Sequence, residues 1–477
     1  MTTSYEYDLV CIGSGPAGQR ASVQAAKLGK RVAVIEQQRS VGGVCIVTGT
    51  IPSKTFREAV RSFTARTADD ANAQILQRPP RPTMEQLVRR VAQVIQREGD
   101  VVQDQLNRND VELVRGHAAF VDGHTLSVDF GTGRRTVTGE HILVAVGTRA
   151  ADPPDAKPDG KTLILSDSIL DLEKLPRTMA VVGAGVIGIE YASMFAALGV
   201  QVTVVDKRPR PLDFVDGEIV DELIHQMRKS NVTFRGGEAV DSIEVAEGPP
   251  RRGVIRLESG KHLVADVVLF SVGRIGATDT LNLQAIGLQP DDRGRLKTDA
   301  WFQTSVPHIF AAGDVIGYPA LAATSGEQGR LAACRMFGYA AEPMAPHFPI
   351  GVYAIPEISL VGATEEELTK NKVPYETGIA RFREIARGNI LGDDSGLFKM
   401  IFHRDDRRLL GVHCIGTGAT ELIHIGQAVL ALGGGLDYFL KTVFNYPTLA
   451  ECYKVAAFNA ANKLHYARAA AGPPPVG

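Results

Sequence analysis

Two glycine-rich segments with the same spacing are the residues in this sequence best suited to binding a nucleotide. The first reads Gly-Ser-Gly-Pro-Ala-Gly over 13–18, and the second reads Gly-Ala-Gly-Val-Ile-Gly over 183–188. Eighteen residues after the last glycine of each segment stands an acid that ends an apolar run, Glu36 in the first and Asp206 in the second. Glycines at this spacing permit a tight turn, the approach of backbone to a pyrophosphate, and close packing of helix on strand, while the acid accepts hydrogen bonds from a ribose diol. Corresponding residues of the two copies are 170 apart, which predicts two dinucleotide sites.

The elements that must position these loops can be read from the flanking residues. Apolar runs over 7–12 and 179–182 lead into the two loops and predict a buried strand before each. A helical stretch follows each loop and ends at Leu28-Gly29 or Leu198-Gly199, where the glycine suits a left-handed cap. We therefore expect a strand–loop–helix–strand unit twice in an α/β chain, with pyrophosphates at the helix N-termini.

Composition excludes several other classes of protein. A chain of 477 residues is long enough for two to four domains, and a net charge of -2 without basic clusters gives no sign of nucleic-acid binding. No apolar run approaches the roughly 20 residues of a membrane span, and the polar N-terminus does not read as a signal peptide. Five widely spaced cysteines predict free thiols in a reducing, cytoplasmic compartment and no metal site.

Three further segments identify a family. Gly42-Gly43-Val44-Cys45 is followed by Pro52-Ser53-Lys54, an apolar strand over 309–312 ends in Gly313-Asp314, and Tyr446-Pro447-Thr448 precedes Glu451. With the two glycine loops, these segments resemble the flavoprotein disulfide reductase family, of the dihydrolipoamide dehydrogenase and glutathione reductase type. The resemblance covers about residue 5 to about residue 465.

The resemblance implies an α/β fold with two Rossmann-like dinucleotide-binding domains, one for FAD and one for NAD(P), and an α+β C-terminal dimerisation domain. The domain boundaries it implies are 1–150 and 275–345 for the two parts of the FAD domain, 151–274 for the NAD(P) domain, 346–466 for the dimerisation domain and 467–477 for a disordered tail. The residues it assigns to FAD are Gly13, Gly15, Gly18, Glu36, Gly42, Gly43, Cys45, Lys54, Ala118, Gly313, Asp314 and Ala322. The residues it assigns to NAD(P) are Gly183, Gly185, Gly188, Glu190, Asp206, Lys207, Arg208 and Gly273. A homodimer is implied as well, because the C-terminal motif of the family reaches the flavin of the partner subunit.

The residues that carry disulfide chemistry in this family are missing. The family motif is roughly GGxCxxxxCxPSK; this chain keeps the first cysteine as Cys45 and has Thr50 in place of the second. Thiol–disulfide exchange needs a second sulfur to resolve the first, so one thiol cannot form the internal disulfide. Tyr446 stands where the family has its acid–base histidine, and a phenol with an ordinary pKa of about 10 is a poor base near neutral pH.

Loss of both parts, with both nucleotide loops kept, indicates a flavoenzyme that stops at hydride transfer. Gly49 to Lys54 and Phe444 to Thr448 are similar to the transhydrogenase branch of the family, which implies exchange of hydride between NADPH and NAD+ through FAD. Lys54 and Glu190 match positions where a lysine and a glutamate pair beside the flavin, and a structural ion pair is an interpretation compatible with that role. Thr50 is expected to fill the volume of the lost sulfur, and Cys45 to be a spectator or to contact the flavin.

Other interpretations remain open at this point. One is an NAD(P)H oxidoreductase that passes electrons from flavin to a quinone, and another keeps Cys45 as a lone redox thiol, with Cys452 as its neighbour. A third is a non-enzymatic FAD-bound scaffold. The run Asp206-Lys207-Arg208-Pro209-Arg210 is either a pocket that tolerates both NAD and a 2′-phosphate or a solvated basic turn.

Overall fold

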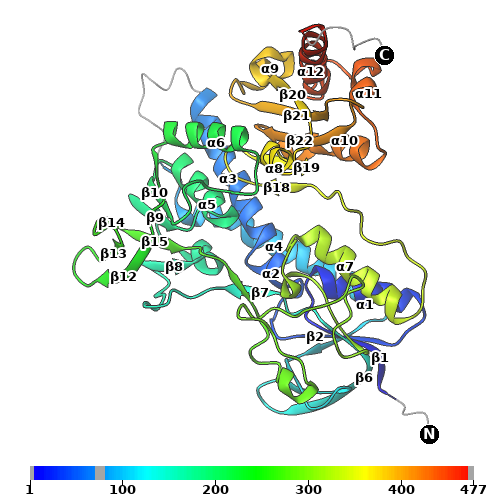
Figure 1. Ribbon diagram of the computed structural model, residues 1–477. Helices are drawn as coiled ribbons and strands as arrows, with labels where there is room; N and C mark the ends of the chain where they lie inside the picture. Colours follow the sequence, from blue (N-terminus) through cyan, green and yellow to red (C-terminus); the bar gives the residue numbers. More distant parts are fainter. Residues whose placement is uncertain (1–4, 70–80, 471–477) are drawn as a thin grey trace. The chain divides into compact units, whose positions relative to one another are not determined.

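The computed structural model describes residues 5–69 and 81–470, and the chain forms two compact units (Figure 1). The first unit comprises Met1–Leu175 and Val272–Met344, and the second comprises Pro176–Ser271 and Ala345–Gly477. The boundaries expected at 150 and 274 fall inside the first unit, and the separation of a nucleotide domain from a dimerisation domain stays a prediction.

The first unit is built on a parallel sheet with strand order β3-β2-β1-β6, to which β17 adds beside β6. Leu9, Val10 and Cys11 of β1 are fully buried, as expected for a central parallel strand covered on both faces. Helices α1 and α7 lie side by side (Figure 1), so closely that a Cβ on Gly329 of α7 would lie 2.1 Å from the carbonyl oxygen of Ala17. The elements of this unit are β1 (Tyr7–Ile12), α1 (Pro16–Lys27), β2 (Val32–Glu36), α2 (Gly43–Val47), α3 (Thr50–Asp69), α4 (Met84–Asn107), β3 (Glu112–Arg115), β4 (His117–Phe120), β5 (Thr125–Asp129), β6 (Arg134–Val144), β7 (Thr148–Ala150), β8 (Leu163–Leu165), β16 (Arg274–Gly276), β17 (Ile309–Ala311) and α7 (Ala322–Met336).

The second unit contains a second parallel sheet, in which strands β11-β10-β9-β15 are neighbours. An antiparallel three-stranded sheet, β12-β13-β14, belongs to the same part of the chain. The elements are β9 (Thr178–Val182), α5 (Val186–Ala197), β10 (Gln201–Asp206), α6 (Gly217–Lys229), β11 (Val232–Gly236), β12 (Val240–Ala246), β13 (Arg252–Leu257), β14 (His262–Ala265) and β15 (Val267–Phe270).

The C-terminal part of the second unit is an antiparallel sheet of order β18-β19-β22-β21-β20 with helices packed against it. Its core includes Phe398, Phe439 and Tyr453, and the rings of Phe398 and Tyr453 lie 4.4 Å apart between centroids. The elements are β18 (Ile350–Val352), β19 (Ile358–Gly362), α8 (Glu365–Lys370), β20 (Tyr375–Arg381), α9 (Ala386–Leu391), β21 (Leu397–His403), β22 (Leu409–Ile415), α10 (Ala419–Ala431), α11 (Leu436–Lys441) and α12 (Glu451–Ala470).

The repeat predicted from the glycine loops is present in the backbone. Helices α1 and α5 begin at Pro16 and Val186, and strands β2 and β10 end at Glu36 and Asp206, so both pairs keep the offset of 170 residues. The expected left-handed caps are also found, at Gly29 with a φ of 75° and at the corresponding glycine of α5 with a φ of 79°. The predicted strand–loop–helix–strand unit is therefore confirmed in both copies.

Two long helices have the following ends. Helix α4 begins after a capping box formed by Thr83 and Gln86. Helix α12 runs to Ala470 and so passes the expected domain end at 466, because the alanines of this stretch have the highest helix propensity. The expected disordered tail over 467–477 stays a prediction: residues 467–470 are the last residues of α12, and residues 471–477 lie outside the described residues. Among the helices of the described residues, none combines the length and the apolar character needed to cross a membrane.

Candidate functional site

The first glycine-rich loop joins β1 to α1 and leaves no room for a side chain at two of its glycines. Gly13 has a φ of 105°, and a Cβ there would lie 2.4 Å from the carbonyl oxygen of Ala145. A Cβ on Gly18 would lie 1.9 Å from the carbonyl oxygen of Gly13, whereas a Cβ on Gly15 would have no atom within 4 Å. Gly13 and Gly18 are therefore needed for the loop itself. Gly15 leaves the open space at the helix N-terminus that a pyrophosphate requires.

The second loop repeats this arrangement between β9 and α5. Gly183 has a φ of 103°, and its Cβ would lie 2.6 Å from the carbonyl oxygen of Ser271. A Cβ on Gly188 would lie 2.0 Å from the carbonyl oxygen of Gly183, and a Cβ on Gly185 would again have no neighbour within 4 Å. The two loops thus offer the same kind of anion site in two separate units.

The carboxylate of Glu36 is buried at the end of β2 and is held against the first loop. It accepts hydrogen bonds from the backbone N–H of Ser14 at 3.0 Å, from the hydroxyl of Ser14 at 2.5 Å and from the backbone N–H of Gln38 at 2.8 Å. The Ser14 hydroxyl in turn accepts from the N–H of Gly42 at 2.8 Å. This network places an acid at the strand end, where an adenosine ribose is expected beside the loop, and so fits one half of FAD.

Asp206 occupies the corresponding place in the second unit. Its Oδ2 accepts a hydrogen bond from the N–H of Ala184 in the glycine loop at 2.6 Å. Burial opposes its charge, but hydrogen bonds from Arg208 and Ala184 outweigh burial, so the pKa of Asp206 lies below its ordinary value. Lys207 is exposed, whereas Arg208 is paired with the acid. The acid is therefore ionised and partly neutralised at the loop.

Asp314 follows Gly313 at the end of β17 and is a partly buried carboxylate with weak hydrogen-bond donors around it. The hydroxyl of Thr148 lies 3.5 Å from Oδ2, and the hydroxyl of Ser325 lies 3.4 Å from Oδ1. Burial raises the pKa of Asp314 in spite of the nearby Arg274. Such a carboxylate normally has closer donors, and the hydroxyls of a ribitol chain would supply them. The residues at this strand end therefore fit FAD.

Arg274 is a residue near this site that the sequence analysis missed. Its Nε donates to the hydroxyl of Thr148 at 2.9 Å and its Nη2 to the carbonyl oxygen of Thr148 at 2.8 Å, while Nη1 pairs with Asp167 at 2.7 Å. Because the Thr148 hydroxyl accepts from Arg274, its own hydrogen is available to Asp314. The sequence feature that could have indicated this residue is the position of an arginine directly after Gly273.

The Gly42-Gly43 turn lies directly against the first loop. Gly42 has a φ of 113° and Gly43 a φ of 59°, so left-handed backbone spans the N-cap and the first residue of α2. A Cβ on Gly43 would lie 3.0 Å from Cα of Gly15. The structure therefore brings together two segments that the sequence analysis assigned to FAD from different motifs.

Cys45 lies in α2 and is half-buried. Burial raises the pKa of its thiol, and a hydrogen bond with the Thr50 side chain partly offsets this rise. Thr50 thus contacts Cys45 from the position where a second sulfur would stand. All five cysteines lie within the described residues and are free thiols, as expected.

Lys54 and Glu190 were expected to pair beside the flavin. Lys54 is half-buried in the second turn of α3, in the first unit. Glu190 is buried in α5 of the second unit, where its Oε1 accepts a hydrogen bond from the N–H of Tyr353 at 2.8 Å. The two residues belong to different units, and the pairing of Lys54 with Glu190 stays a prediction.

The C-terminal motif lacks a base in the structure as well. The side chain of Tyr446 is exposed, with 69% of its surface accessible. Glu451 begins α12, and its Oε2 is buried without a hydrogen-bond partner among the described residues. A carboxylate in this condition is consistent with the loss of the histidine that it would orient.

The positions of three other residues assigned to FAD or NAD(P) do not test their roles as ligand contacts. Ala118 is buried in β4, and Ala322 is the first residue of α7. Gly273, with a φ of 132°, belongs to the first unit, whereas the glycines of the second loop belong to the second unit. Their roles as ligand contacts stay predictions.

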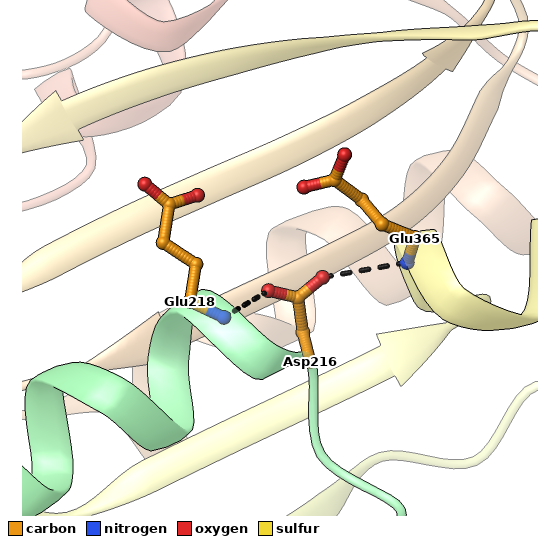
Figure 2. Close-up of side chains that lie close together, drawn as sticks. All are labelled: Asp216, Glu218 and Glu365. Carbon is orange, nitrogen blue, oxygen red and sulfur yellow. Dashed lines mark hydrogen bonds between the residues drawn. The ribbon is translucent and has the colours of Figure 1, made fainter. Parts of the chain in front are cut away.

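A group of acidic side chains that the sequence analysis did not anticipate gathers where α6 and α8 begin (Figure 2). Asp216 accepts hydrogen bonds from the backbone N–H groups of Glu218 and Glu365. The ammonium of Lys399 lies among the three carboxylates, 2.8 Å from Asp216 and 3.1 Å from Glu218, and also pairs with Glu365. A lysine therefore holds the position that a cation would take. Residue spacing in the sequence did not predict this group, because its members come from distant segments of the chain.

Comparison with known proteins agrees with this geometry. The family model described as pyridine nucleotide-disulphide oxidoreductase matches residues 7–329, and the dimerisation domain of the same family matches residues 348–457. The chain belongs to this family. Membership confirms the expected fold class and the expected cofactors, FAD and nicotinamide nucleotides.

Relatives within the family are similar over nearly the whole chain. A protein of Mycobacterium tuberculosis named soluble pyridine nucleotide transhydrogenase is 52% identical over 461 residues, which are 96% of this chain and 98% of the relative. A protein of Klebsiella pneumoniae with the same name is 43% identical over 472 residues, 97% of this chain and 100% of the relative. Among solved structures, a HOCl-induced flavoprotein disulfide reductase from Escherichia coli superposes with a TM-score of 0.85 at 26% identity, covering 95% of this chain and 99% of that one.

Proposed function

We propose that this chain transfers hydride between NADPH and NAD+, with FAD as its bound cofactor, to give NADP+ and NADH. The observation that carries the proposal is the near-full-length similarity to relatives named soluble pyridine nucleotide transhydrogenase. The structure supports the proposal because both dinucleotide loops have open anion sites, while Thr50 and Tyr446 replace the thiol and base of disulfide chemistry.

Different residues of this chain would bind FAD and the nicotinamide nucleotide. Gly15, Glu36 and Asp314 would hold the pyrophosphate, adenosine ribose and ribitol of FAD in the first unit. Gly185 and Asp206 would hold the pyrophosphate and ribose of the nicotinamide nucleotide in the second. When bound, FAD supplies the hydride chemistry, and the protein supplies orientation and electrostatics.

The polar residues expected nearest the flavin ring have electrostatic roles. A lysine ammonium at Lys54 would favour negative charge on the ring, and Glu190 would orient that lysine. Cys45 is assigned no step, because hydride exchange between two nicotinamides needs neither a thiol nor a net proton transfer. Its raised pKa keeps the thiol protonated near neutral pH, which agrees with a spectator role.

The alternative, an NAD(P)H:quinone or diaphorase-type oxidoreductase, is not favoured. Relatives at 42–52% identity are named for transfer between pyridine nucleotides. We expect the purified flavoprotein to reduce thio-NAD+ with NADPH, and the Cys45→Ser variant to do so at a similar rate. Brisk reduction of a quinone with negligible reduction of thio-NAD+ would overturn the proposal.

The assembly and location proposed here are a homodimer in the cytoplasm. The match to the dimerisation domain supports the dimer, as do exposed apolar side chains such as Leu432 and Val443, with 87% and 92% of their surfaces accessible. In the homodimer, the segment that carries Tyr446 would reach the flavin of the partner subunit. The free thiols support a reducing compartment, and the net charge of -2 gives no support for a nucleic-acid partner.

A further inference from the structure

The guanidinium of Arg208 is held by the acid that ends β10. Its Nε lies 3.1 Å from Oδ1 of Asp206 and its Nη2 lies 2.8 Å from Oδ2, which makes a two-point pair. The backbone N–H of Arg208 also donates to Oδ1 at 2.8 Å. Since Asp206 accepts from Ala184 of the glycine loop as well, the pair lies beside the proposed ribose position.

The same guanidinium reaches a second acid on the solvent side. Its Nη1 lies 2.9 Å from Oδ1 of Asp213. The Asp213 side chain is 63% accessible, whereas the Asp206 side chain is only 9% accessible. Arg208 therefore bridges a buried acid and an exposed one, and it has a partner on either side.

The second arginine of this segment is held elsewhere. Arg210 pairs with Asp221 of α6 and donates to the carbonyl oxygen of Gly217 at 2.9 Å. Its side chain is 49% accessible, against 35% for Arg208, and these partners do not include Asp206. Arg210 thus provides a matched control of the same residue type in the same turn.

NAD and NADP make opposite demands on this position. The ribose diol of NAD needs a free carboxylate oxygen, whereas the 2′-phosphate of NADP needs a cation and is repelled by an unpaired carboxylate. An arginine that can either neutralise the carboxylate or move away from it satisfies both demands, provided that a second acid can pair with its guanidinium.

We propose that Arg208 determines which nucleotide this pocket accepts by moving between two partners, and that Asp213 sets the balance. Beside Asp206, the guanidinium neutralises the acid and presents N–H groups to a 2′-phosphate. Turned toward Asp213, it releases Asp206 to the diol of NAD. This inference rests on the proposed function, because only an enzyme that uses both nucleotides needs such a pocket.

The test measures binding of two fragments that carry no nicotinamide, 5′-AMP and 2′,5′-ADP, to the flavin-loaded enzyme by calorimetry. We expect Arg208→Met to weaken 2′,5′-ADP about 10- to 100-fold while changing 5′-AMP much less. We expect Asp213→Asn to shift the affinity ratio about two- to fivefold toward 2′,5′-ADP, because the guanidinium loses its outer partner and the phosphate loses a nearby negative charge. Arg210→Met should leave the ratio within about twofold of the original, the size of a weak surface effect.

Three results would overturn the inference. They are equal weakening of both fragments by Arg208→Met with unchanged flavin absorbance, an unchanged ratio in Asp213→Asn, and an Arg210→Met effect as large as that of Arg208→Met. Failure of the proposed function would look different. In that case the wild-type enzyme would not pass hydride from NADPH to thio-NAD+, even though the fragment ratios shifted as described.

Discussion

The ammonium nitrogen of Lys399 lies 2.8 Å from Oδ1 of Asp216, and both side chains are almost completely buried. Lys399 belongs to β21, whereas Asp216 caps the N-terminus of α6 by accepting from the N–H of Glu218. One buried cation therefore joins the start of a Rossmann helix to the C-terminal sheet of the same unit. Removing one partner of a buried pair leaves the other charge without compensation, which costs far more than losing a surface pair.

Lys399→Met should strongly destabilise the protein. It would leave Asp216 and its acidic neighbours in the interior without their cation, and the expected loss is about 3–5 kcal/mol of folding free energy. Thermal unfolding followed by flavin fluorescence would measure it. The control is Lys261→Met, which removes an exposed lysine paired with Glu238 and should change the midpoint only marginally. Similar midpoints for the two variants would show that the buried cluster contributes little.

Acid should destabilise the protein through His413, the cross-strand neighbour of Lys399 on β22. Its Nε2 lies 3.0 Å from the carbonyl oxygen of Ala363, its Nδ1 has no hydrogen-bond partner among the described residues, and burial lowers its pKa. Above the ordinary histidine pKa of about 6.5, both folded and unfolded chains hold it neutral; below that value only the unfolded chain readily takes the proton. Stability should therefore fall as the pH drops below about 6.5.

Asp216 acts in the same direction at lower pH. Burial opposes its charge, but the ammonium of Lys399 and the backbone N–H of Glu365 outweigh burial and lower its pKa, so its contribution is lost as the pH falls through the folded value. Thermal midpoints of the wild type and His413→Gln, measured from pH 8 to pH 5, would separate the two groups. The variant should lose less stability than the wild type between pH 7 and pH 5.5, and parallel curves would contradict the assignment to His413.

Alanine substitutions should distinguish the folding role from the binding role of the second loop. Gly185→Ala meets no atom within 4 Å and has an ordinary φ of -78°, so the enzyme should fold and keep its flavin. Its methyl group would, however, stand in the proposed pyrophosphate position, and KM for both nucleotides should rise about tenfold or more. Gly188→Ala would place a Cβ 2.0 Å from the carbonyl oxygen of Gly183 and should lower the unfolding midpoint as well. An unchanged KM in Gly185→Ala would place the nucleotide elsewhere.

Restoring both missing parts should create disulfide reductase activity that the wild type lacks. Thr50→Cys places a second thiol beside Cys45, since the Thr50 side chain already contacts that sulfur. Adding Tyr446→His supplies a base, which should raise turnover of lipoamide or glutathione disulfide about 100-fold over either single variant. The measurement is NADH oxidation with each disulfide. Turnover of these disulfides by the wild type at a rate close to its thio-NAD+ reduction would contradict our interpretation of Thr50 and Tyr446.

Much of the fold could be predicted because the signals were local. A glycine loop, its helix and the acid at the next strand end depend on φ values and apolar runs within about 30 residues, the span of one βαβ unit. This is why α1 and α5 begin where the repeat requires. Composition alone did not show that α12 would extend past residue 466 to Ala470.

The sequence by itself determined which reactive groups the protein has. These are two dinucleotide loops and one thiol at Cys45, with Thr50 in place of a second cysteine and Tyr446 in place of a histidine. Reactivity of this kind follows from the type of side chain at a position, which needs no coordinates. Only the tertiary structure decided which acid each cation meets, placing Arg208 on Asp206 and Lys399 on Asp216. Charge pairing depends on distance through space, and the partner of Lys399 comes from a segment 183 residues away in the chain.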